Sequence, residues 1–242
     1  FWSMTFTGGH VMDRINNIST VLKGTEADAV GSEGDAIMPK LLFTEGGSQF
    51  DIYAVRSAGI DPATGQEIFI KKDGTYTYKY DEDDRVAVGN SNPVLNGSWI
   101  NTLRYKGFTL SLTTSYTFGA DFYNTTLQSK VENIDPYKNV DARAYTERWK
   151  NPGDLVRFLA INTVNNQMVN SERFVERRNE IYVSNVQFTY DFQTKWLNKI
   201  GLKRLCLGLG MSDIGYISTV KFERGTSYPY CRSINLIFRP TF

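Results

Sequence analysis

Residues able to carry out chemistry are few and scattered in this chain of 242 residues. His10 is the only histidine, and it lies in the sequence TGGH with no second histidine or cysteine nearby to share a metal ion. A Ser-His-Asp hydrolase is disfavoured for the same reason, because its base would have to be this one side chain. We therefore expect no catalytic residues, no metal site and no cofactor, and we interpret the protein as a non-enzyme.

Three other polar or reactive motifs are also interpreted as structural. The acidic run at 81–84 (DEDD) lacks EF-hand spacing and predicts a solvated loop. GIDPATG at 59–65 predicts a turn, because no helix pattern or Lys-Ser/Thr pair of a phosphate loop follows it. Cys206 and Cys231 are too far apart for a metal or redox motif; a disulfide is open to them in an oxidising compartment, but we favour two small semi-buried side chains.

Charge and hydropathy exclude two further classes. With 27 Lys+Arg against 26 Asp+Glu, the net charge of +1 gives no basis for binding nucleic acid. Mean hydropathy is −0.35, and no apolar run approaches the roughly 20 residues of a membrane helix. Alternating strands hide their hydrophobicity from such averages, so a membrane role would have to come from β-strands. The start, FWSMTFTGGH, has no signal-peptide pattern, so in an exported protein we expect further chain before Phe1.

The elements expected to position these residues are β-strands, because apolar and polar side chains alternate with period 2. In the stretch 108–118 the even-numbered residues are mainly Phe, Leu and Tyr, and the odd-numbered residues are Thr and Ser. The same pattern predicts strands at 181–192, 203–211 and 234–242, with fainter ones at 2–6, 50–56 and 97–105.

These strands have the length and the faces of a membrane barrel. Most are near the roughly 10 residues of a tilted membrane-spanning strand, whereas strands of soluble sheets cluster near 5 to 6. Their second face carries Thr, Ser, Asn, Gln and Gly with few charges, which suits a polar lumen better than a water-facing surface. The sequence therefore predicts an all-β fold, an antiparallel transmembrane β-barrel segment of about seven strands; a soluble β-sheet is the alternative.

The connections are predicted to be short at one end of the barrel and long at the other, as in outer-membrane barrels. The turns at 105–108 and 193–201 are short, whereas 120–180 is far longer than ordinary loops within a domain. Placing the C-terminus on the periplasmic side puts both short turns on that side. Segment 9–46 breaks the pattern, because it is long where a short turn is expected. Within the long connections we expect helical character at 141–149 and a hairpin at 67–80.

Several segments together carry a family resemblance: SAGIDPATGQEIFIKKDGT (57–75), VGNSNPVLNGSWINTLRYKGFTLSLTTSYTFGADFYN (88–124), ERWKNPGD (147–154), ERFVERRNEIYVSNVQFTYDF (172–192), MSDIGYISTVKFERGTSYPY (211–230) and the closing strand. In this order and spacing they resemble the C-terminal part of the SusC/RagA family of TonB-dependent outer-membrane transporters. The likeness covers nearly the whole chain from residue 48, and segment 9–46 is poorly matched.

This resemblance implies that residues 1–242 form the C-terminal part of a larger, plugged barrel of roughly 22 strands, with long extracellular loops. The plug and the TonB-contacting segment would lie before Phe1. The whole protein would sit in outer-membrane lipid and import glycans or oligopeptides, with a SusD-like surface lipoprotein as partner and energy delivered through TonB; such pairs would assemble as dimers. A passive porin or structural barrel is the alternative function, followed by a soluble glycan-binding β-domain.

The resemblance and the aromatic pattern together suggest roles for individual residues. Phe238 and the terminal Phe242 resemble the C-terminal signal read by the outer-membrane assembly machinery. Tyr105 and Trp196, in the short turns, are expected in an aromatic girdle at the membrane interface. Aromatic residues of the long loops are candidate contacts to a ligand or partner, with a purely structural role as the alternative: Tyr123, Tyr137, Tyr145, Trp149 and Tyr228.

Overall fold

A computed structural model describes residues 1–18, 26–27, 41–134, 137, 139–161, 169–192, 197, 199–221 and 232–242. The chain divides into two compact units. The first comprises Phe1–Val11, Pro93–Gly119 and Arg178–Phe242, and the second comprises Met12–Asn92 and Ala120–Arg177.

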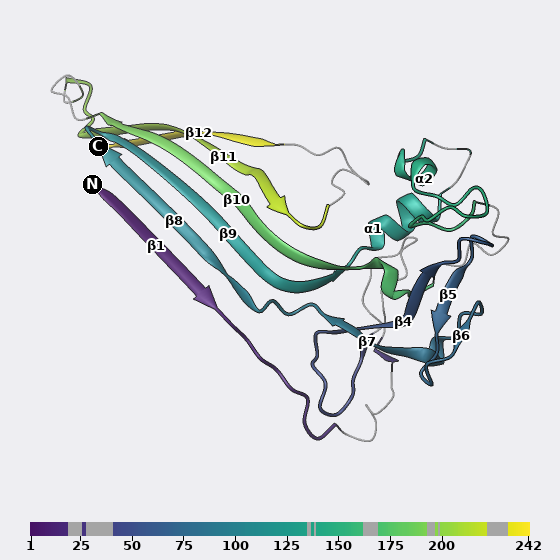
Figure 1. Cartoon of the computed structure of the whole chain (residues 1–242). Coiled ribbons are helices and arrows are strands. Elements are labelled where there is room, and N and C mark those ends of the chain that lie inside the picture. Colours follow the sequence, from purple (N-terminus) through teal and green to yellow (C-terminus); the bar gives the residue numbers. More distant parts are fainter. Residues whose placement is uncertain are drawn as a thin grey trace. The chain divides into compact units, whose positions relative to one another are not determined.

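The first unit holds a six-stranded antiparallel sheet with the strand order β1-β8-β9-β10-β11-β12 (Figure 1). Its longest strands, β9 and β10, have 16 and 18 residues, well above the roughly 5 to 6 residues usual in globular proteins. The fold class predicted from the sequence is confirmed. The strands span Trp2–Gly9 (β1), Leu95–Tyr105 (β8), Phe108–Tyr123 (β9), Val175–Phe192 (β10), Arg204–Ser218 (β11) and Ser233–Thr241 (β12).

The strand registers extend the predicted alternation across the sheet. Leu209 lies opposite Phe188 on one neighbouring strand and opposite Leu236 on the other. Ser111 lies opposite Thr102. Because directly opposed residues of neighbouring strands project to the same side, the sheet has one apolar face and one polar face.

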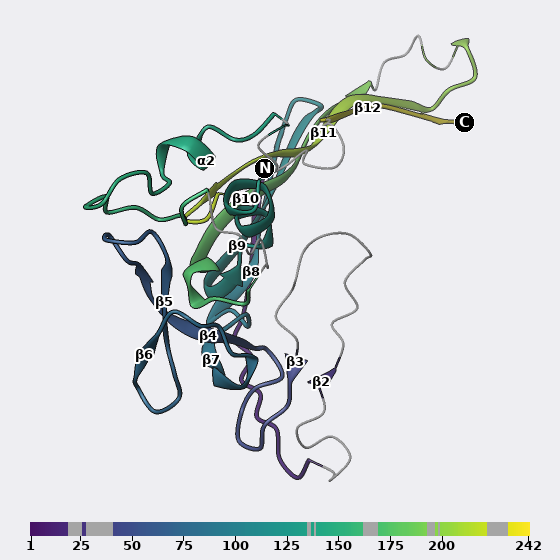
Figure 2. The ribbon, with the colours of Figure 1, turned by 90° about the vertical axis from the view of Figure 1, so that its right-hand side faces the viewer.

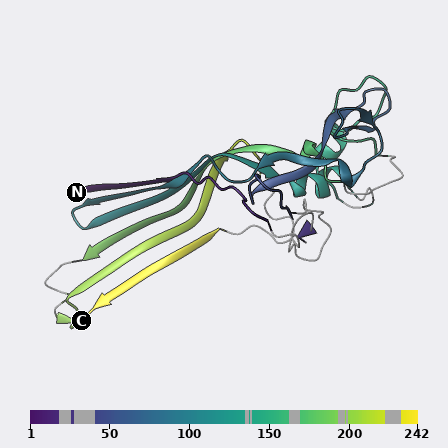
Figure 3. The ribbon, with the colours of Figure 1, turned by 90° about the horizontal axis from the view of Figure 1, so that it is seen from below.

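The sheet's connections are short at one end and long at the other. Figure 3 shows both chain termini at the end where β8 turns into β9. The turn consists of Lys106 and Gly107, with φ of 44° and 87°, and positive φ at both central residues is what a type I′ hairpin turn requires. The second connection at this end is 193–203, whereas those at the far end are 10–94, 124–174 and 219–232.

The expectation that residues 50–56 form a barrel strand is wrong. This stretch belongs to β4 (Asp51–Ile60), which lies in the second unit within a four-stranded sheet of order β6-β5-β4-β7 (Figure 2). Four consecutive side chains of β4, Ile52 to Val55, are at most 9% exposed, so both faces of the strand are covered by protein. In the six-stranded sheet β8 is the neighbour of β1, so residues 10–94 form one long connection between these two strands. Segment 9–46 is the first part of that connection, and the predicted asymmetry of short turns at one end and long loops at the other is therefore not broken.

The second unit has its own core and only short helical segments. The predicted hairpin at 67–80 is present, with Gly74 at φ 86° in its turn, and the predicted helical stretch contains α2. None of the helices that the structure describes is long and apolar enough to cross a membrane. The core side chains are Ile52, Tyr123, Leu127, Val131, Ala144, Phe158 and Phe174. The remaining elements are β2 (Glu26–Ala27), β3 (Leu41–Leu42), β5 (Glu67–Ile70), β6 (Tyr76–Thr77), η1 (Glu82–Asp84), β7 (Arg85–Asn90), α1 (Thr125–Leu127), the π-helical η2 (Gln128–Glu132), α2 (Arg143–Thr146) and η3 (Glu172–Phe174).

Candidate functional site: the two faces of the six-stranded sheet

The apolar face of the six-stranded sheet leaves large hydrophobic side chains uncovered. Leu236 is 85% exposed and Leu209 is 52% exposed, although both lie in regular, paired strand. Contiguous apolar surface of this kind is rare on soluble monomers and marks contact with a lipid or a protein. Other exposed members of this face are Trp2, Met4, Phe6, Trp99, Leu103, Leu110, Phe188, Leu207, Ile234 and Phe238.

Two groups of aromatic rings bound this apolar face. Near the turn end, the ring centroid of Phe108 lies 4.4 Å from Tyr190 and 5.5 Å from Phe188. Toward the far end, Tyr116 stacks on Phe6 at 5.3 Å. Phe108 and Tyr116 are eight residues apart on the same strand, which at about 3.3 Å per residue separates the two groups by roughly 26 Å. For a strand tilted by about 40°, as in transmembrane barrels, this separation along the strand corresponds to about 20 Å along the membrane normal, which is most of the apolar band of about 25 Å between the aromatic girdles of such barrels.

Glycine makes room for the far aromatic group. The Tyr116 hydroxyl donates a hydrogen bond to the Thr7 carbonyl at 2.7 Å, and its ring passes over the opposed pair Gly8 and Gly97. A Cβ on Gly97 would overlap the Thr7 carbonyl oxygen and lie 2.5 Å from the Tyr116 hydroxyl oxygen. The position of this ring therefore depends on the missing side chain of Gly97.

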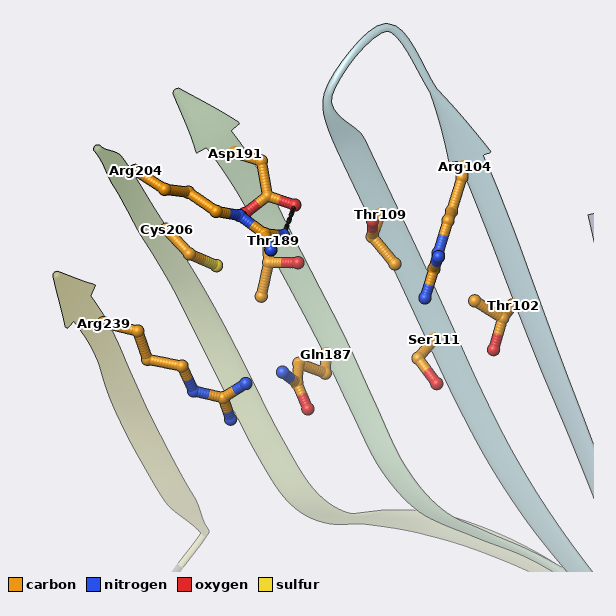
Figure 4. A pocket seen from close by; sticks show the side chains of 10 residues that line it. All are labelled: Thr102, Arg104, Thr109, Ser111, Gln187, Thr189, Asp191, Arg204, Cys206 and Arg239. Carbon is orange, nitrogen blue, oxygen red and sulfur yellow. Dashed lines mark hydrogen bonds and ion pairs between the residues drawn. The ribbon is translucent and has the colours of Figure 1, made fainter. Parts of the chain in front are cut away.

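The polar face contains a hollow of about 350 Å³ near the turn end (Figure 4). Five strands contribute to it: β8, β9, β10, β11 and β12. Its lining combines three arginines and one carboxylate with Thr, Ser and Gln side chains and the thiol of Cys206. Both oxygens of Asp191 accept from Arg204, at 2.6 and 3.0 Å. This surface is hydrophilic and rich in hydrogen-bond donors.

Residues predicted at the turn end lie there with exposed rings. Tyr105 is 65% exposed and Phe242 is 76% exposed, and Phe238 projects from the apolar face of β12 opposite Leu207. This exposure suits contact with lipid or with assembly machinery, and the assembly role of the two phenylalanines stays a prediction. Trp196 and Cys231 lie outside the described residues, while Cys206 is a free, buried thiol.

The predicted contacts in the long loops differ in accessibility. Tyr137 is 96% exposed, and Tyr145 is 70% exposed with the Lys150 ammonium 3.5 Å from its ring centroid. Trp149 is half-buried, and its indole N–H donates to the Pro62 carbonyl at 2.8 Å. Tyr123 is only 6% exposed and belongs to the core, so its ring is not available as a loop contact; it is the last residue of β9, and the long connection starts after it. Tyr228 lies outside the described residues.

A buried ion-pair network in the second unit was not anticipated from the sequence. The Arg173 guanidinium binds Glu67 at 2.7 Å and Glu132 at 2.8 Å, and all three side chains are at most 9% exposed. Burial alone would lower the pKa of Arg173, but the two carboxylates outweigh it and raise this pKa. Burial also raises the pKa of Glu132, although Arg173 opposes the shift. The network joins three chain segments that only the tertiary fold brings together.

The motifs first considered for chemistry form structural contacts. The ring nitrogen Nδ1 of His10 lies 2.5 Å from the Val94 carbonyl oxygen, to which it donates. Asp81 caps η1 by accepting from the Asp83 N–H at 3.0 Å. In the part of the chain that the structure describes, no three His, Cys, Asp or Glu side chains come together in a way that could hold a metal ion.

Comparisons with known proteins fit this two-faced sheet. No protein-family model matches the chain. It is 24% identical over 230 residues to TonB-dependent receptor P39 of Formosa agariphila, covering 86% of this chain and 22% of the receptor. Among solved structures, it superposes on a chain of the RagAB peptide importer in the open-open state with a TM-score of 0.70 and 14% identity, over 100% of this chain and 27% of that one. The closed-closed state gives a TM-score of 0.58 at 16% identity, over 77% and 22%.

The chain thus spans about a quarter or less of the proteins that it matches. Their names describe a receptor and an importer, not enzymes. The resemblance stated from the sequence is confirmed: in sequence and in fold, the chain is similar to a segment of a TonB-dependent transporter barrel.

Proposed function

We propose that the six-stranded sheet is a stretch of the wall of an outer-membrane β-barrel, with its apolar face in lipid and its polar face toward the lumen. One observation carries this proposal: an uncovered apolar face bounded by aromatic groups roughly 26 Å apart along the strand, which at a strand tilt of about 40° is about 20 Å along the membrane normal, or most of the roughly 25 Å apolar band of such barrels. In this arrangement the turn between β8 and β9 faces the periplasm, and the three long connections lie outside the cell.

We further propose that the complete protein is an active importer that works through TonB. The likeness to a TonB-dependent receptor and to the RagAB peptide importer supports this function. The structural neighbours favour oligopeptides as the transported solute, and glycans are the second candidate. A SusD-like lipoprotein would capture the solute above the barrel and contact the external loops. In this proposal residues 1–242 supply barrel wall and loops, and other parts of the protein supply the plug.

Uptake by intact cells tests this function. Cells that carry the protein and cells from which its gene is deleted are given fluorescent oligopeptides and fluorescent oligosaccharides, each with and without a functional TonB. We expect one class of solute to enter only when both the protein and TonB are present. Solute entry that requires the protein but not TonB would contradict active import and would support a passive porin. Recovery of the protein as a soluble species in the periplasm would contradict the proposal that it forms part of a membrane barrel.

A further inference from the structure

We propose that Lys106 and Lys203 bind the headgroup phosphates of anionic phospholipids at the turn end of the six-stranded sheet, where β8 turns into β9. The proposal rests on the proposed function, because it takes the apolar face to be in lipid and the turn end to face the periplasm. It adds the headgroup chemistry that this rim of the wall recognises.

The turn end carries an excess of positive charge. Among the residues that the structure describes, the only carboxylates there are that of Asp191, whose two oxygens are occupied by Arg204, and the C-terminal carboxylate of Phe242. The far half of the same unit carries both signs, with Glu180 and Asp213 as well as cations. The exposed cationic side chains of the turn end are Arg104, Lys106, Lys199, Lys203, Arg204 and Arg239.

Lys106 lies beside an aromatic ring of the apolar face. Its ammonium group is 5.3 Å from the ring centroid of Tyr105, which is 65% exposed and lies opposite Phe108 in the strand register. Phe108 belongs to the turn-end aromatic group. Because aromatic rings of this kind occupy the headgroup level of a membrane, the Lys106 ammonium lies where lipid phosphates are found.

Lys203 occupies the corresponding place two strands away in the sheet. It is exposed and directly precedes β11, and its backbone N–H donates to the Thr241 carbonyl at 2.8 Å. Thr241 is followed by Phe242, whose ring is 76% exposed, and Leu205 begins the apolar face two residues further along β11. In the described part of the chain, neither Lys106 nor Lys203 has an ion-pair partner for its ammonium group.

The adjacent apolar face selects a lipid phosphate over a soluble anion. An exposed ion pair contributes little to affinity by itself, so a free phosphate ion would not be retained at either lysine. The phosphate of a phospholipid is instead held at this level by acyl chains that contact Leu110 and Leu207 on the apolar face. Lysine suits the position, because its methylene stem lies along apolar surface while its ammonium group reaches the headgroups.

Lipid-selective quenching tests each lysine separately. The complete protein, with its own cysteines changed to serine, carries one fluorophore at Leu110→Cys or at Leu207→Cys. Each position is on the apolar face and four residues from one of the two lysines. The protein is reconstituted in vesicles of phosphatidylcholine in which a rising fraction is replaced by brominated phosphatidylglycerol or, in parallel, by brominated phosphatidylcholine. The two quenching curves give the preference for the anionic lipid at each position.

We expect a preference of roughly fivefold for phosphatidylglycerol at both positions, the factor that one lysine near an anionic surface contributes. Lys106→Gln removes it at position 110 and leaves it at 207, whereas Lys203→Gln does the reverse. Lys106→Arg and Lys203→Arg retain it, because arginine keeps the charge. The control Arg104→Gln removes a cation at the same end but on the polar face, and it changes neither preference.

The proposal is overturned if the two lipids quench equally at both positions in the wild-type background. It is also overturned if both Gln variants keep the preference, or if Arg104→Gln removes it as fully as they do. Failure of the proposed function gives a different result: if neither brominated lipid quenches at 110 or 207, the apolar face is not in lipid at all.

Discussion

Placing an arginine at Val186 tests whether the apolar face is in lipid. Val186 projects from the apolar face of β10 opposite Met211. It lies four residues from Tyr190 of the turn-end aromatic group, or about 13 Å along the strand at roughly 3.3 Å per residue, which is half of the roughly 26 Å between the two groups. If the two aromatic groups mark the membrane interfaces, Val186 lies at the middle of the hydrocarbon.

The expected cost of Val186→Arg follows from this depth. An arginine on the lipid face of a barrel costs about 2–4 kcal/mol at the midplane and about 0–1 kcal/mol near the interfaces. Two matched variants separate the effect of membrane depth from the effect of the sheet face. Asn185→Arg is adjacent in sequence to Val186 but lies on the polar face. Leu205→Arg lies on the apolar face, opposite Phe192, but at the turn end of the apolar band. We expect both controls to stay within about 1 kcal/mol of wild type.

The free energy of unfolding is measured by guanidinium titration of the complete protein in lipid vesicles. The expected order of destabilisation is Val186→Arg, then Leu205→Arg, with Asn185→Arg near wild type. If Val186→Arg costs no more than Asn185→Arg, the assignment of the apolar face to lipid is refuted, because a water-exposed strand surface tolerates either substitution about equally.

Three further predictions use the same unfolding measurement. Gly97→Ala is expected to cost about 1–3 kcal/mol, because its methyl group overlaps the Thr7 carbonyl, whereas Gly215→Ala, with nothing within 4 Å of its Cβ, is expected to be neutral. Arg173→Met leaves two buried carboxylates without their ion-pair partner and is expected to cost about 3–5 kcal/mol near neutral pH, with a smaller loss in acid, where Glu132, whose pKa is raised by burial, takes up a proton. Hydrogen bonds from the Ala63 N–H and the Thr64 hydroxyl lower the pKa of Asp61 below 3.8, so its stabilisation is present above that pH and is lost as the pH falls through the lowered pKa; Asp61→Asn is expected to destabilise at neutral pH and to have no effect in strong acid. The steric explanation is contradicted if Gly97→Ala and Gly215→Ala change the free energy of unfolding equally. The ion-pair explanation is contradicted if Arg173→Met is as stable as wild type, and the explanation for Asp61 is contradicted if the effect of Asp61→Asn does not depend on pH.

The sequence predicted the strands of the six-stranded sheet because alternation is a local property. Leu205, Leu207 and Leu209 alternate with polar or small residues over a few positions. In a β-strand this alternation alone places the three leucines on the same face, and the registers with the two neighbouring strands keep them there. Ile52 to Val55 also read as strand, but the number of buried faces depends on what packs against them. That information lies in distant residues such as Phe158 and Phe174, so β4 was assigned to the wrong sheet.

The sites were harder to predict for the same physical reason. Arg173 meets Glu67 across more than one hundred residues of chain, and no spacing rule connects them. Likewise, Arg104 on β8 and Arg239 on β12 reach one hollow only because the five neighbouring strands from β8 to β12 lie in a fixed register. The core position of Tyr123 could not be inferred from alternation, which would place this odd-numbered residue on the polar face of β9; its burial depends on distant residues such as Phe174.

The most direct test of the central claim compares Leu110 with Ser111, adjacent residues on opposite faces of β9. Each is replaced by cysteine in a complete protein whose own cysteines are changed to serine, labelled with an environment-sensitive fluorophore, and reconstituted in vesicles containing brominated lipid. A barrel wall with its apolar face in lipid predicts strong quenching at position 110 and little at 111. Equal quenching at the two positions, or stronger quenching at 111, would contradict this account.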